Sequence, residues 1–570
     1  MSESQLFGNV SSASLAGLLL VCGASWAAAP GQADLLADHV NTQDVVTYGM
    51  GLNVNRYSPL DQINASTVEH LAPAWTASLD DDHGQEAQPL VHDGVIYAIT
   101  HKSTFAFDAR TGKPLWRHDL TYEKRMFRVV CCGMVARGAV LYEGKLIRQT
   151  LDNHVLALDM KTGKEVWNVQ AADWQDGYTM TGAPLVANGV VIAGVAGGDM
   201  GVRGFLDGYD AATGQKLWRF WTTAGPDDPG GKTWEGDAYL HGGGATWLPG
   251  SYDPKLDLVY WGIGNPGPWN AIVRPGDNLY TDSVVALRPK TGERVWHYQY
   301  APNDTFDYDG VNELIQADLQ IDGKPRQVIL NANRNGFFYV IDRATGELLK
   351  ANQFVDTLNW ATGLEPKTGK PILSEVAQAV LAGQEQVVWP SNIGGKNWGP
   401  ASYNPNTGLV YLNGFELSMK YKLLNASWRR GMMYVAADFS FRLPDDGKPL
   451  GYLRAVDPLT GKRIWEVPHD PPSNGGTLST AGDLVFTGLM TGELVAHHAR
   501  TSKLLWSHKT GSGIIGPPIT YDLDGEQYVA VMSGIGGLLA LYLPHPELAK
   551  VPKGGSLTVF RLPRPAGAAN

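Results

Sequence analysis

The sequence predicts an all-β fold, an eight-bladed β-propeller with tryptophan-docking repeats and a few loop and helical insertions. The first observation is a recurring phrase: a short apolar strand, the turn D-x-x-T-G, and a second strand that usually ends in Trp. The second observation is the spacing, because the turns recur at intervals near 50 residues, a period typical of propellers. The copies are TFAFDARTGKPLW (104–116), HVLALDMKTGKEVW (154–167), LDGYDAATGQKLW (206–218), VVALRPKTGERVW (284–296), FYVIDRATGELLK (338–350), ASYNPNTGLVYL (401–412), LRAVDPLTGKRIW (453–465) and LVAHHARTSKLLW (494–506).

Each copy is expected to be a β-hairpin. Asp supplies a side-chain hydrogen bond in the turn and Gly supplies the positive φ that a tight turn needs. An upstream strand, such as HDGVIYAI (92–99), predicts four strands in each unit. The recurring indoles are expected to pack between neighbouring blades; they are Trp116, Trp167, Trp218, Trp296, Trp465 and Trp506.

Three intervals are longer than the repeat and predict insertions, at 219–270, 351–397 and 413–450. Within the second, SEVAQAVLAGQ (374–384) is the one stretch with a helical pattern. Long insertions on a closed propeller usually build the mouth of a site. We therefore expect them to border a functional cavity.

The first 29 residues are predicted to be a signal peptide, and residues 30–570 to form the propeller domain. An apolar run, Ala13–Ala29, ends in an Ala-rich zone and is too short for a stable membrane span. Its weak point is the region before it, MSESQLFGNV, which has no Lys or Arg. Cleavage near Ala29 would leave only two cysteines, which are adjacent, as suits an oxidising compartment. The expected location is the periplasm.

Several function classes are excluded. A formal net charge of −11 argues against nucleic-acid binding. The two G-x-G-x-x-G matches, at 262–267 and 511–516, are followed by prolines and open no helix, so neither predicts a nucleotide site. The sequence contains no C-x-x-C-H motif, so it does not predict covalently attached haem. The spacing of the 14 histidines does not predict a zinc site.

The adjacent cysteines in RVVCCGMVARG (128–138) raise a question about their purpose. A disulfide between Cys131 and Cys132 would join Cα atoms about 3.8 Å apart, below the usual range of about 4.4–6.8 Å. It would close no long loop and would add little chain-entropy stability. From the residues alone, a strained bridge and two free thiols both stay open.

A second group of residues offers oxygen ligands. Asp307 and Asp309, two positions apart, project from the same face of an extended segment. Together with Asp199 and Asn265 they would form an all-oxygen site for a hard cation. The alternative is that these Asp and Asn residues only form turns.

The vicinal cysteines, the D-x-x-T-G-x-x-x-W repeats, EGDAYLHGGGATWLPGSYDP (235–254) and GNPGPWNAIVRPGDN (264–278) together resemble the quinoprotein alcohol dehydrogenases. These are relatives of methanol and ethanol dehydrogenases that use pyrroloquinoline quinone (PQQ). The likeness runs from about Val45 to about Tyr542. It implies an eight-bladed propeller with PQQ and a metal ion in its central funnel.

The resemblance also implies a role for each matching position. The cysteine pair would form a disulfide ring against one face of PQQ, and Trp247 would cover the other face. Asp307 would be the general base, and Arg334 would hydrogen-bond the reactive quinone carbonyl and hold Asp307. The positions that match PQQ ligands are Glu86, Cys131, Cys132, Arg137, Thr181, Trp247, Arg334 and Asn397, and those that match metal ligands are Asp199, Asn265 and Asp307, with Asp309 as the additional one.

Three positions depart from the family pattern. Asp199 stands where glutamate is usual, Ala196 where serine is common, and Ile535 where tryptophan is frequent. Asp309 resembles the lanthanide-dependent branch, because a trivalent ion of near-calcium size favours more anionic oxygen ligands. We therefore expect a lanthanide ion, with Ca²⁺ as the alternative.

The predicted function is a periplasmic quinoprotein that oxidises a primary alcohol to the aldehyde by hydride transfer to PQQ. Trp269, Phe306 and Met433 are candidates for an apolar pocket wall. A soluble c-type cytochrome is the expected electron acceptor, and the acidic surface would help a basic cytochrome to dock. A homodimer is one expectation for the assembly. The alternatives are a PQQ dehydrogenase for a larger substrate (a sugar, a polymeric or ring alcohol, or an amine) and a non-catalytic propeller scaffold.

Overall fold

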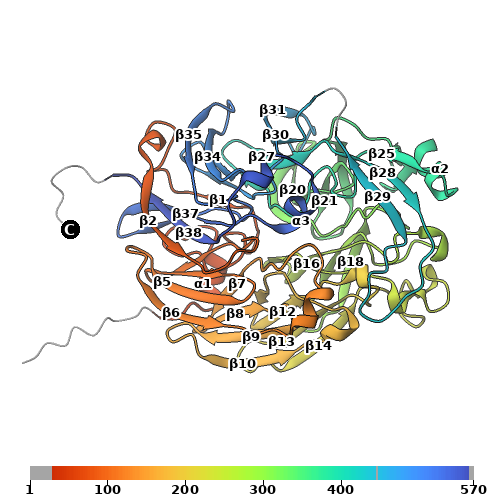
Figure 1. The fold of residues 1–570 in the computed structure, drawn as a ribbon, viewed down its shortest axis with the longest axis horizontal. Helices are drawn as coiled ribbons and strands as arrows, with labels where there is room; N and C mark the ends of the chain where they lie inside the picture. The colour runs from red at the N-terminus through yellow and green to blue at the C-terminus, as the bar shows by residue number, and fades with distance from the viewer. Residues whose placement is uncertain (1–27, 444–446, 564–570) are drawn as a thin grey trace, which may run out of the picture.

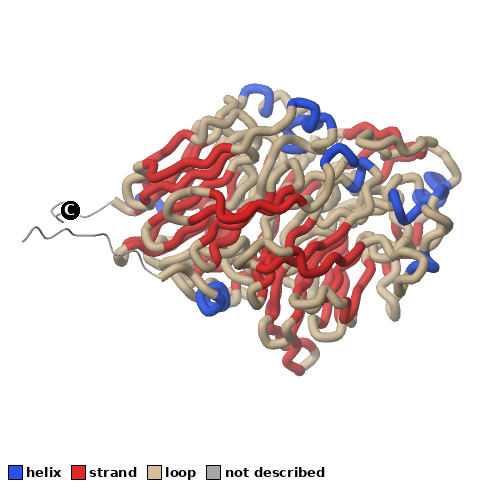
Figure 2. The backbone as a smooth tube through the Cα atoms, turned by 90° about the horizontal axis from the view of Figure 1, so that it is seen from below, coloured by secondary structure: helices blue, strands red, loops and turns tan. Residues whose placement is uncertain are grey.

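The computed structural model describes residues 28–443 and 447–563, and the predicted signal peptide (1–29) lies almost wholly outside this part. The described chain consists mainly of strands and loops, with short helices at the periphery of the molecule (Figure 2). None of the described helices is both long and apolar enough to cross a membrane. The α-helices are α1 (Gln32–Ala37), α2 (Glu375–Leu381) and α3 (Gly537–Tyr542), and the 3₁₀ helices are η1 (Val68–His70), η2 (Lys124–Arg128), η3 (Trp174–Asp176), η4 (Gly198–Met200), η5 (Gly231–Thr233), η6 (Ala238–His241), η7 (Ala271–Val273) and η8 (Leu548–Lys550).

The strands form a propeller, as predicted. Within the described residues there are eight sheets of four or five strands, which follow one another around the molecule in chain order (Figure 1). This number is compatible with eight blades. The first four sheets consist of β3 (Leu90–His92), β4 (Val95–Ile99), β5 (Ser103–Asp108) and β6 (Pro114–Asp119); β7 (Ala139–Tyr142), β8 (Lys145–Gln149), β9 (His154–Asp159) and β10 (Glu165–Gln170); β11 (Leu185–Ala187), β12 (Val190–Gly194), β13 (Phe205–Asp210) and β14 (Lys216–Trp221); and β15 (Ser251–Asp253), β16 (Leu258–Ile263), β17 (Ser283–Leu287) and β18 (Arg294–Gln299).

The other four sheets include two that recruit strands from the N-terminal part of the chain. They consist of β19 (Ile315–Ile321), β20 (Lys324–Ala332), β21 (Phe337–Asp342) and β22 (Leu348–Gln353); β26 (Ser402–Asn404), β27 (Leu409–Phe415), β30 (Gly451–Val456) and β31 (Arg463–His469); β32 (Thr477–Thr480), β33 (Leu484–Gly488), β34 (Glu493–His498) and β35 (Leu504–Lys509) with β1 (Tyr57–Ser58); and β36 (Ile519–Leu523), β37 (Glu526–Ser533) and β38 (Ser556–Arg561) with β2 (Ala72–Ser78).

The predicted insertions carry the strands that lie outside these sheets. The insertion at 351–397 contains β23 (Ala361–Leu364), β24 (Pro371–Leu373), β25 (Gln386–Val388) and α2, which falls within the predicted helical stretch 374–384. The insertion at 413–450 contains β28 (Ser418–Leu423) and β29 (Ala437–Arg442). β28 pairs with both β25 and β29, so the two insertions join into one small sheet.

The copies of the repeat do not map one to one onto the sheets. The turn in 401–412 joins β26 to β27, whereas the turn in 453–465 joins β30 to β31 of the same sheet. Our assignment of 401–412 to a unit of its own is therefore wrong. The reason is that an Asn/Asp-x-x-Thr-Gly turn suits the first hairpin of a blade as well as the last. The last sheet, with β36 to β38, contains no copy of the phrase and takes its fourth strand, β2, from the start of the chain.

The ring closes through that borrowed strand. β2 pairs antiparallel with β38, and Trp75 lies opposite Val559. A second N-terminal strand, β1, pairs in parallel with β32. Because both ends of the domain contribute to shared sheets, the first and last blades cannot separate without breaking ladder hydrogen bonds.

The recurring tryptophans dock each blade onto the next, as predicted. Trp116 donates through Nε1 to the Met160 carbonyl (2.9 Å), and its ring covers Gly163, where a Cβ atom would lie only 2.5 Å from the indole. Trp75 was not predicted but does the same to the first repeat, and Trp506 closes the cycle by donating to Leu71. The sheet of β22 has Lys350 at the tryptophan position, and Asn352 packs against Gly461 instead.

Candidate active site

All twelve predicted site residues line one cavity of about 320 Å³. Their backbones belong to the connections that lead from one sheet to the next, and to the hairpins β12–β13, β16–β17 and β20–β21. These segments are distant in sequence and converge because each blade presents its loops at the same end of the ring. The predicted wall residues Trp269 and Met433 also line the cavity.

Phe306 is not among the lining residues, so its prediction as a wall residue is wrong. Its side chain is buried in the core and packs against the rings of Tyr308, Trp360 and Tyr421. Its neighbour Asp307 faces the cavity instead. The alternation of side chains along an extended segment places adjacent residues on opposite sides, which explains the difference.

One side of the cavity is an ion pair beneath an aromatic ring. Cys131 and Cys132 form a disulfide at this cavity. Arg137 pairs with Glu86 (Nη2–Oε2, 2.7 Å) and donates to the Thr181 hydroxyl (2.8 Å). Burial raises the pKa of Glu86 and lowers that of Arg137, and each charge partly offsets the effect on the other.

The cavity fits a planar, anionic ligand. The Arg137 guanidinium lies 4.7 Å from the centre of the Trp247 ring. Among the described residues, Nε of Arg137, Nε of Arg334 and Oδ1 of Asn392 are buried and have no hydrogen-bond partner. Buried polar atoms in proteins are normally paired, and these three line the cavity, so a ligand with several acceptors and at least one donor would satisfy them. PQQ, with its carboxylates, carbonyls and ring N–H, has this chemistry.

Asp309 is the most firmly held of the three carboxylates. Its Oδ2 forms an ion pair with Arg334 (Nη2, 2.9 Å) and accepts a hydrogen bond from the Trp247 indole (3.3 Å). Its Oδ1 accepts the backbone N–H of Asn265 (2.8 Å). Gly264 permits this approach, because a Cβ atom there would lie 2.2 Å from the same oxygen. The glycine that directly follows β16 therefore leaves room for the Asp309 carboxylate at the centre of the site.

Asp199 is held from the other side. Its Oδ1 accepts from the Trp269 indole (2.9 Å) and from the Asn265 amide (3.3 Å). Burial raises its pKa; the hydrogen bond from Trp269 opposes this shift, and the charge of Asp309 adds to it. The insertion 413–450 reaches this point, since the Tyr434 N–H donates to the Asp199 carbonyl (2.7 Å).

The carboxylate of Asp307 is repelled by the charges of both Asp199 and Asp309. Its Oδ2 is 3.5 Å from Nη1 of Arg334, which also donates to the Asp307 carbonyl (3.1 Å). Burial raises the pKa of Asp307 well above its usual value, the charge of Asp199 raises it further, and Arg334 opposes both. A raised pKa means a stronger base once the proton is removed, which suits a group that accepts a proton from a hydroxyl.

The acidic side of the cavity lacks enough positive charge of its own. Asp199, Asp307 and Asp309 face one guanidinium, that of Arg334. In the described structure their carboxylates do not converge to within 4.8 Å of one another as a trio. A cation would have to draw them together or use water as a bridge. Such a cation would relieve the repulsion that raises two of the pKa values.

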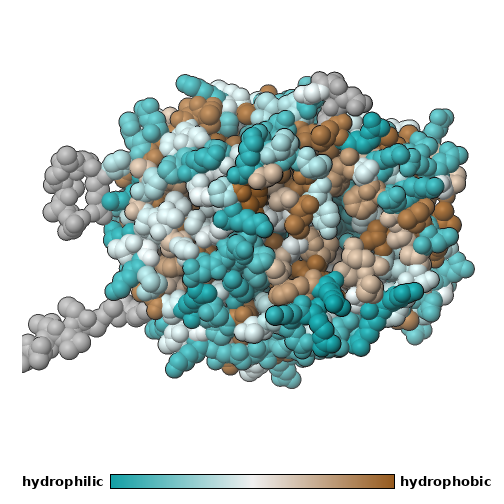
Figure 3. Space-filling model, viewed as in Figure 1, coloured by the Kyte–Doolittle hydropathy of each residue, from teal (hydrophilic) through white to brown (hydrophobic). Residues whose placement is uncertain are grey.

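The mouth of the cavity is apolar, and most of its residues were not predicted. The 413–450 insertion was expected to border the site, but its sequence did not show which side chains face inward. Apolar surface lies near the centre of the face that contains α3 (Figure 3). The residues missed are Val435, Phe439 and Phe441 of the insertion, Leu538 and Tyr542 of α3, and Trp398 and Asn392 beside the predicted Asn397.

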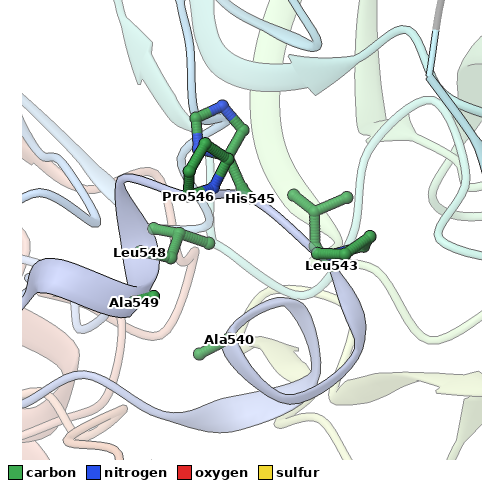
Figure 4. Close-up of a pocket in the computed structure, with 7 residues that line it drawn as sticks. Ala540, Leu543, His545, Pro546, Leu548 and Ala549 are labelled. Carbon is green, nitrogen blue, oxygen red and sulfur yellow. The ribbon is translucent and has the colours of Figure 1, made fainter.

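A second hollow lies beside α3 and η8 (Figure 4). Its volume is about 370 Å³, and it is lined by Ala540, Leu543, Pro544, His545, Pro546, Leu548 and Ala549. It contains none of the predicted site residues. His545, its only titratable lining residue, pairs with Asp470 (3.0 Å), so the hollow offers no set of groups for chemistry.

A family model described as PQQ glucose/ethanol/alcohol dehydrogenase, beta-propeller domain, matches residues 46–352 and 378–529. The chain belongs to this family. This PQQ dehydrogenase-family chain is 41% identical to quinoprotein alcohol dehydrogenase PedH of Pseudomonas putida strain KT2440, over 96% of the chain and 95% of that protein. It is 42% identical to quinohemoprotein alcohol dehydrogenase ADH IIB of Pseudomonas putida, over 92% of the chain and 79% of that protein.

A solved structure agrees with the family assignment. A europium-containing methanol dehydrogenase superposes with a TM-score of 0.88 at 35% identity, covering 93% of this PQQ dehydrogenase-family chain and all of the other. The propeller predicted from the repeats is thus the fold of an experimentally determined relative. The family resemblance drawn from the vicinal cysteines and the two long motifs is confirmed.

Proposed function

We propose that this chain oxidises a primary alcohol to the aldehyde with PQQ and a bound metal ion. The observation that carries the proposal is the convergence of the disulfide, Trp247, Arg137, Arg334 and three carboxylates on one cavity. A non-catalytic scaffold needs none of these groups. The resemblance to proteins named as alcohol dehydrogenases supports the same activity.

Some of the cavity residues would bind PQQ, and others would take part in the reaction. The disulfide and Trp247 would bound the ring faces of PQQ, and Glu86, Arg137, Thr181 and Asn397 would bind its polar edge. When bound, PQQ supplies a quinone carbonyl that accepts hydride, and the metal supplies a Lewis acid. Asp307 would take the proton of the substrate hydroxyl. Arg334 would orient Asp307 by contacting both the carboxylate and the backbone carbonyl of Asp307.

The proposed metal is a lanthanide, with Ca²⁺ as the alternative. Asp199, Asp307 and Asp309 offer three anionic ligands and Asn265 a neutral one, which favours a trivalent ion. The likeness to a europium-containing enzyme supports this choice. The test is dye-linked alcohol oxidation by the purified apo-protein with PQQ and either La³⁺, Ce³⁺ or Ca²⁺. Activity with a lanthanide alone is expected; activity with Ca²⁺ alone would overturn the choice of metal.

Asp309→Asn is expected to weaken the activity that depends on a lanthanide ion. The change removes one anionic ligand and the ion pair with Arg334 while keeping the shape of the side chain. Lanthanide-dependent activity should fall at least about 100-fold, within the range for lost metal ligation and its support. The matched control is Asp322→Asn, an 84% exposed carboxylate near Lys350, which should behave as wild type. Unchanged lanthanide activation in Asp309→Asn would remove Asp309 from the ligand set.

The substrate is proposed to be an alcohol larger than methanol. Met433, Val435, Phe439 and Trp269 make the wall beside the carboxylates apolar, which favours alkyl or aromatic groups over sugars. Met433→Ala should raise KM for benzyl alcohol about 10-fold, the effect of a lost apolar contact, and change KM for ethanol little. The control is Met432→Ala, because Met432 is similarly exposed but does not line the cavity. Equal KM changes in both variants would contradict the proposal.

Electrons are proposed to pass to a soluble c-type cytochrome. The net charge of −11 would attract a basic partner and accelerate its encounter at low salt. We further propose that the protein acts in the periplasm, to which residues 1–29 would direct it as a signal peptide. The disulfide at the cavity is the kind of bond that persists in such an oxidising compartment.

A further inference from the structure

A cluster of metal-ligating side chains lies outside the cavity. Asp81 and His83 belong to the connection between β2 and β3, and His101 belongs to the hairpin between β4 and β5. One ligand atom from each of the three lies within 4.8 Å of the other two, and no other group of three or more His, Cys, Asp or Glu in the described residues meets this condition. None of the three lines the cavity.

The carboxylate of Asp81 bridges the two imidazoles. Its Oδ1 is hydrogen-bonded to Nδ1 of His83 (2.9 Å), and its Oδ2 lies 3.0 Å from Nδ1 of His101. Despite that short distance, neither Oδ2 of Asp81 nor Nδ1 of His101 has an aligned hydrogen-bond partner among the described residues. A hydrogen bond requires the N–H to point at the oxygen. A shared metal ion instead requires both lone pairs to point at a third position.

The ligand atoms are buried and their backbone is fixed. The side chain of Asp81 is fully buried, that of His101 is 4% exposed, and that of His83 is 34% exposed. The His101 carbonyl accepts from Tyr122 (Oη, 2.8 Å) and Arg148 (Nη2, 3.2 Å). The Asp81 Oδ1 also accepts the backbone N–H of His83 (3.0 Å). Two of the three ligands are therefore pre-organised, and His83 lies on the side open to solvent.

We propose that Asp81, His83 and His101 bind a divalent first-row transition ion, for which Zn²⁺ is the best match. Two imidazole nitrogens and one carboxylate oxygen are ligands that zinc accepts, with the remaining position taken by water or another oxygen. The exposed carboxylate of Asp82 lies 3.2 Å from Nδ1 of His83 and can supply that oxygen. The linear spacing of the histidines did not predict this site, because His83 and His101 are brought together only by the fold of β3 and β4.

The proposed ion would brace the segment that delivers Glu86 to the cavity. This segment runs from β2 past Asp81 and His83 to Glu86. Its backbone hydrogen bonds run from Leu79 to Gly555 and from Gln85 to Gly534, and an exposed ion pair joins Asp80 to Arg117 of β6. Both of those hydrogen bonds lead to the C-terminal sheet. The metal would add a link in the opposite direction, to the β4–β5 hairpin.

The proposal is tested by Zn²⁺ titration of the untagged full chain at pH 7.5. Binding is measured by calorimetry, and the bound metal is quantified after dialysis. We expect one Zn²⁺ per chain with micromolar or tighter affinity, and at least about 100-fold weaker binding in His101→Gln and in Asp81→Asn. Co²⁺ in place of Zn²⁺ should give visible absorption bands typical of nitrogen and oxygen ligation. His83→Gln, at the partly exposed position, provides a variant whose folding is at little risk.

Two controls make the test specific. His70→Gln removes a 68% exposed histidine remote from the cluster and should bind Zn²⁺ as wild type does. Asp309→Ala removes a carboxylate of the cavity, and unchanged Zn²⁺ binding there would exclude that site as the source of the signal. A wild-type protein that takes up no Zn²⁺, or cluster variants that bind it as tightly as His70→Gln, would show that the cluster is only a hydrogen-bonded group.

Discussion

Asp307→Asn is expected to lower kcat for alcohol oxidation about 10³-fold, a typical effect of losing a general base. The amide cannot accept the hydroxyl proton, and it would give the proposed metal ion no negative charge. The backbone at Asp307 has φ +63°, a left-handed conformation that Asn adopts more readily than other residues, so the fold should be retained. The expected loss is therefore chemical and not structural.

The measurement is steady-state kinetics with an artificial electron acceptor, together with PQQ and metal content of each preparation. Asp277→Asn serves as the control, because Asp277 is an exposed carboxylate paired with Lys370 and lies outside the cavity. If Asp307→Asn loads PQQ and metal fully and still turns over at the wild-type rate, Asp307 is not the base. If it loads no metal, restoring activity with excess metal would assign the loss to ligation.

Lys396→Met is expected to lower the free energy of unfolding by about 3–5 kcal/mol, the usual result of breaking a buried ion pair. The ammonium of Lys396 is fully buried and pairs with Glu313 (Nζ–Oε2, 2.7 Å). It also donates to the carbonyl of Asn397 (3.0 Å), whose side chain faces the cavity. Methionine fills the same volume but leaves the Glu313 carboxylate buried without its counter-charge.

The free energy is measured by denaturant unfolding followed by circular dichroism. The matched control is Lys420→Met: its partner Glu385 is equally close (2.7 Å), but both side chains are about half exposed. That surface pair should contribute less than about 1 kcal/mol. Similar losses in the two variants would mean that burial does not set the strength of the Lys396 pair. Weaker PQQ binding in Lys396→Met would follow from the displaced Asn397.

The sequence predicted the fold well because the repeat encodes local turn chemistry. The turn Asp accepts from both the N–H and the hydroxyl of the turn Thr at Asp108, Asp159, Asp210 and Asp342. What it could not show is which hairpin of a blade a given turn occupies, so 401–412 was assigned to the wrong unit. It also could not show that β2 completes the last sheet, because that pairing depends on strands at opposite ends of the chain.

The sequence predicted the site residues that belong to family motifs. It did not predict those whose orientation or burial depends on the three-dimensional fold. The polar residues converge as the resemblance implied, although the ion pair of Arg334 is closer to Asp309 than to Asp307. Phe306 was misplaced because a single position on an extended segment changes which face a side chain takes. Lys396 went unnoticed, since nothing in NIGGKNWGP shows that its ammonium is buried against Glu313.

The pairing of β2 with β38 also constrains when the protein can finish folding. β2 ends at Ser78 and β38 begins at Ser556, so one of the earliest strands to be made waits for the last one. At synthesis rates of about 5–20 residues per second, that interval lasts roughly 25–95 seconds. During it the nascent chain has an open ring with an unpaired sheet edge. Because the ring closes only when β38 has been made, the propeller cannot reach its finished fold while the rest of the chain is still being synthesised.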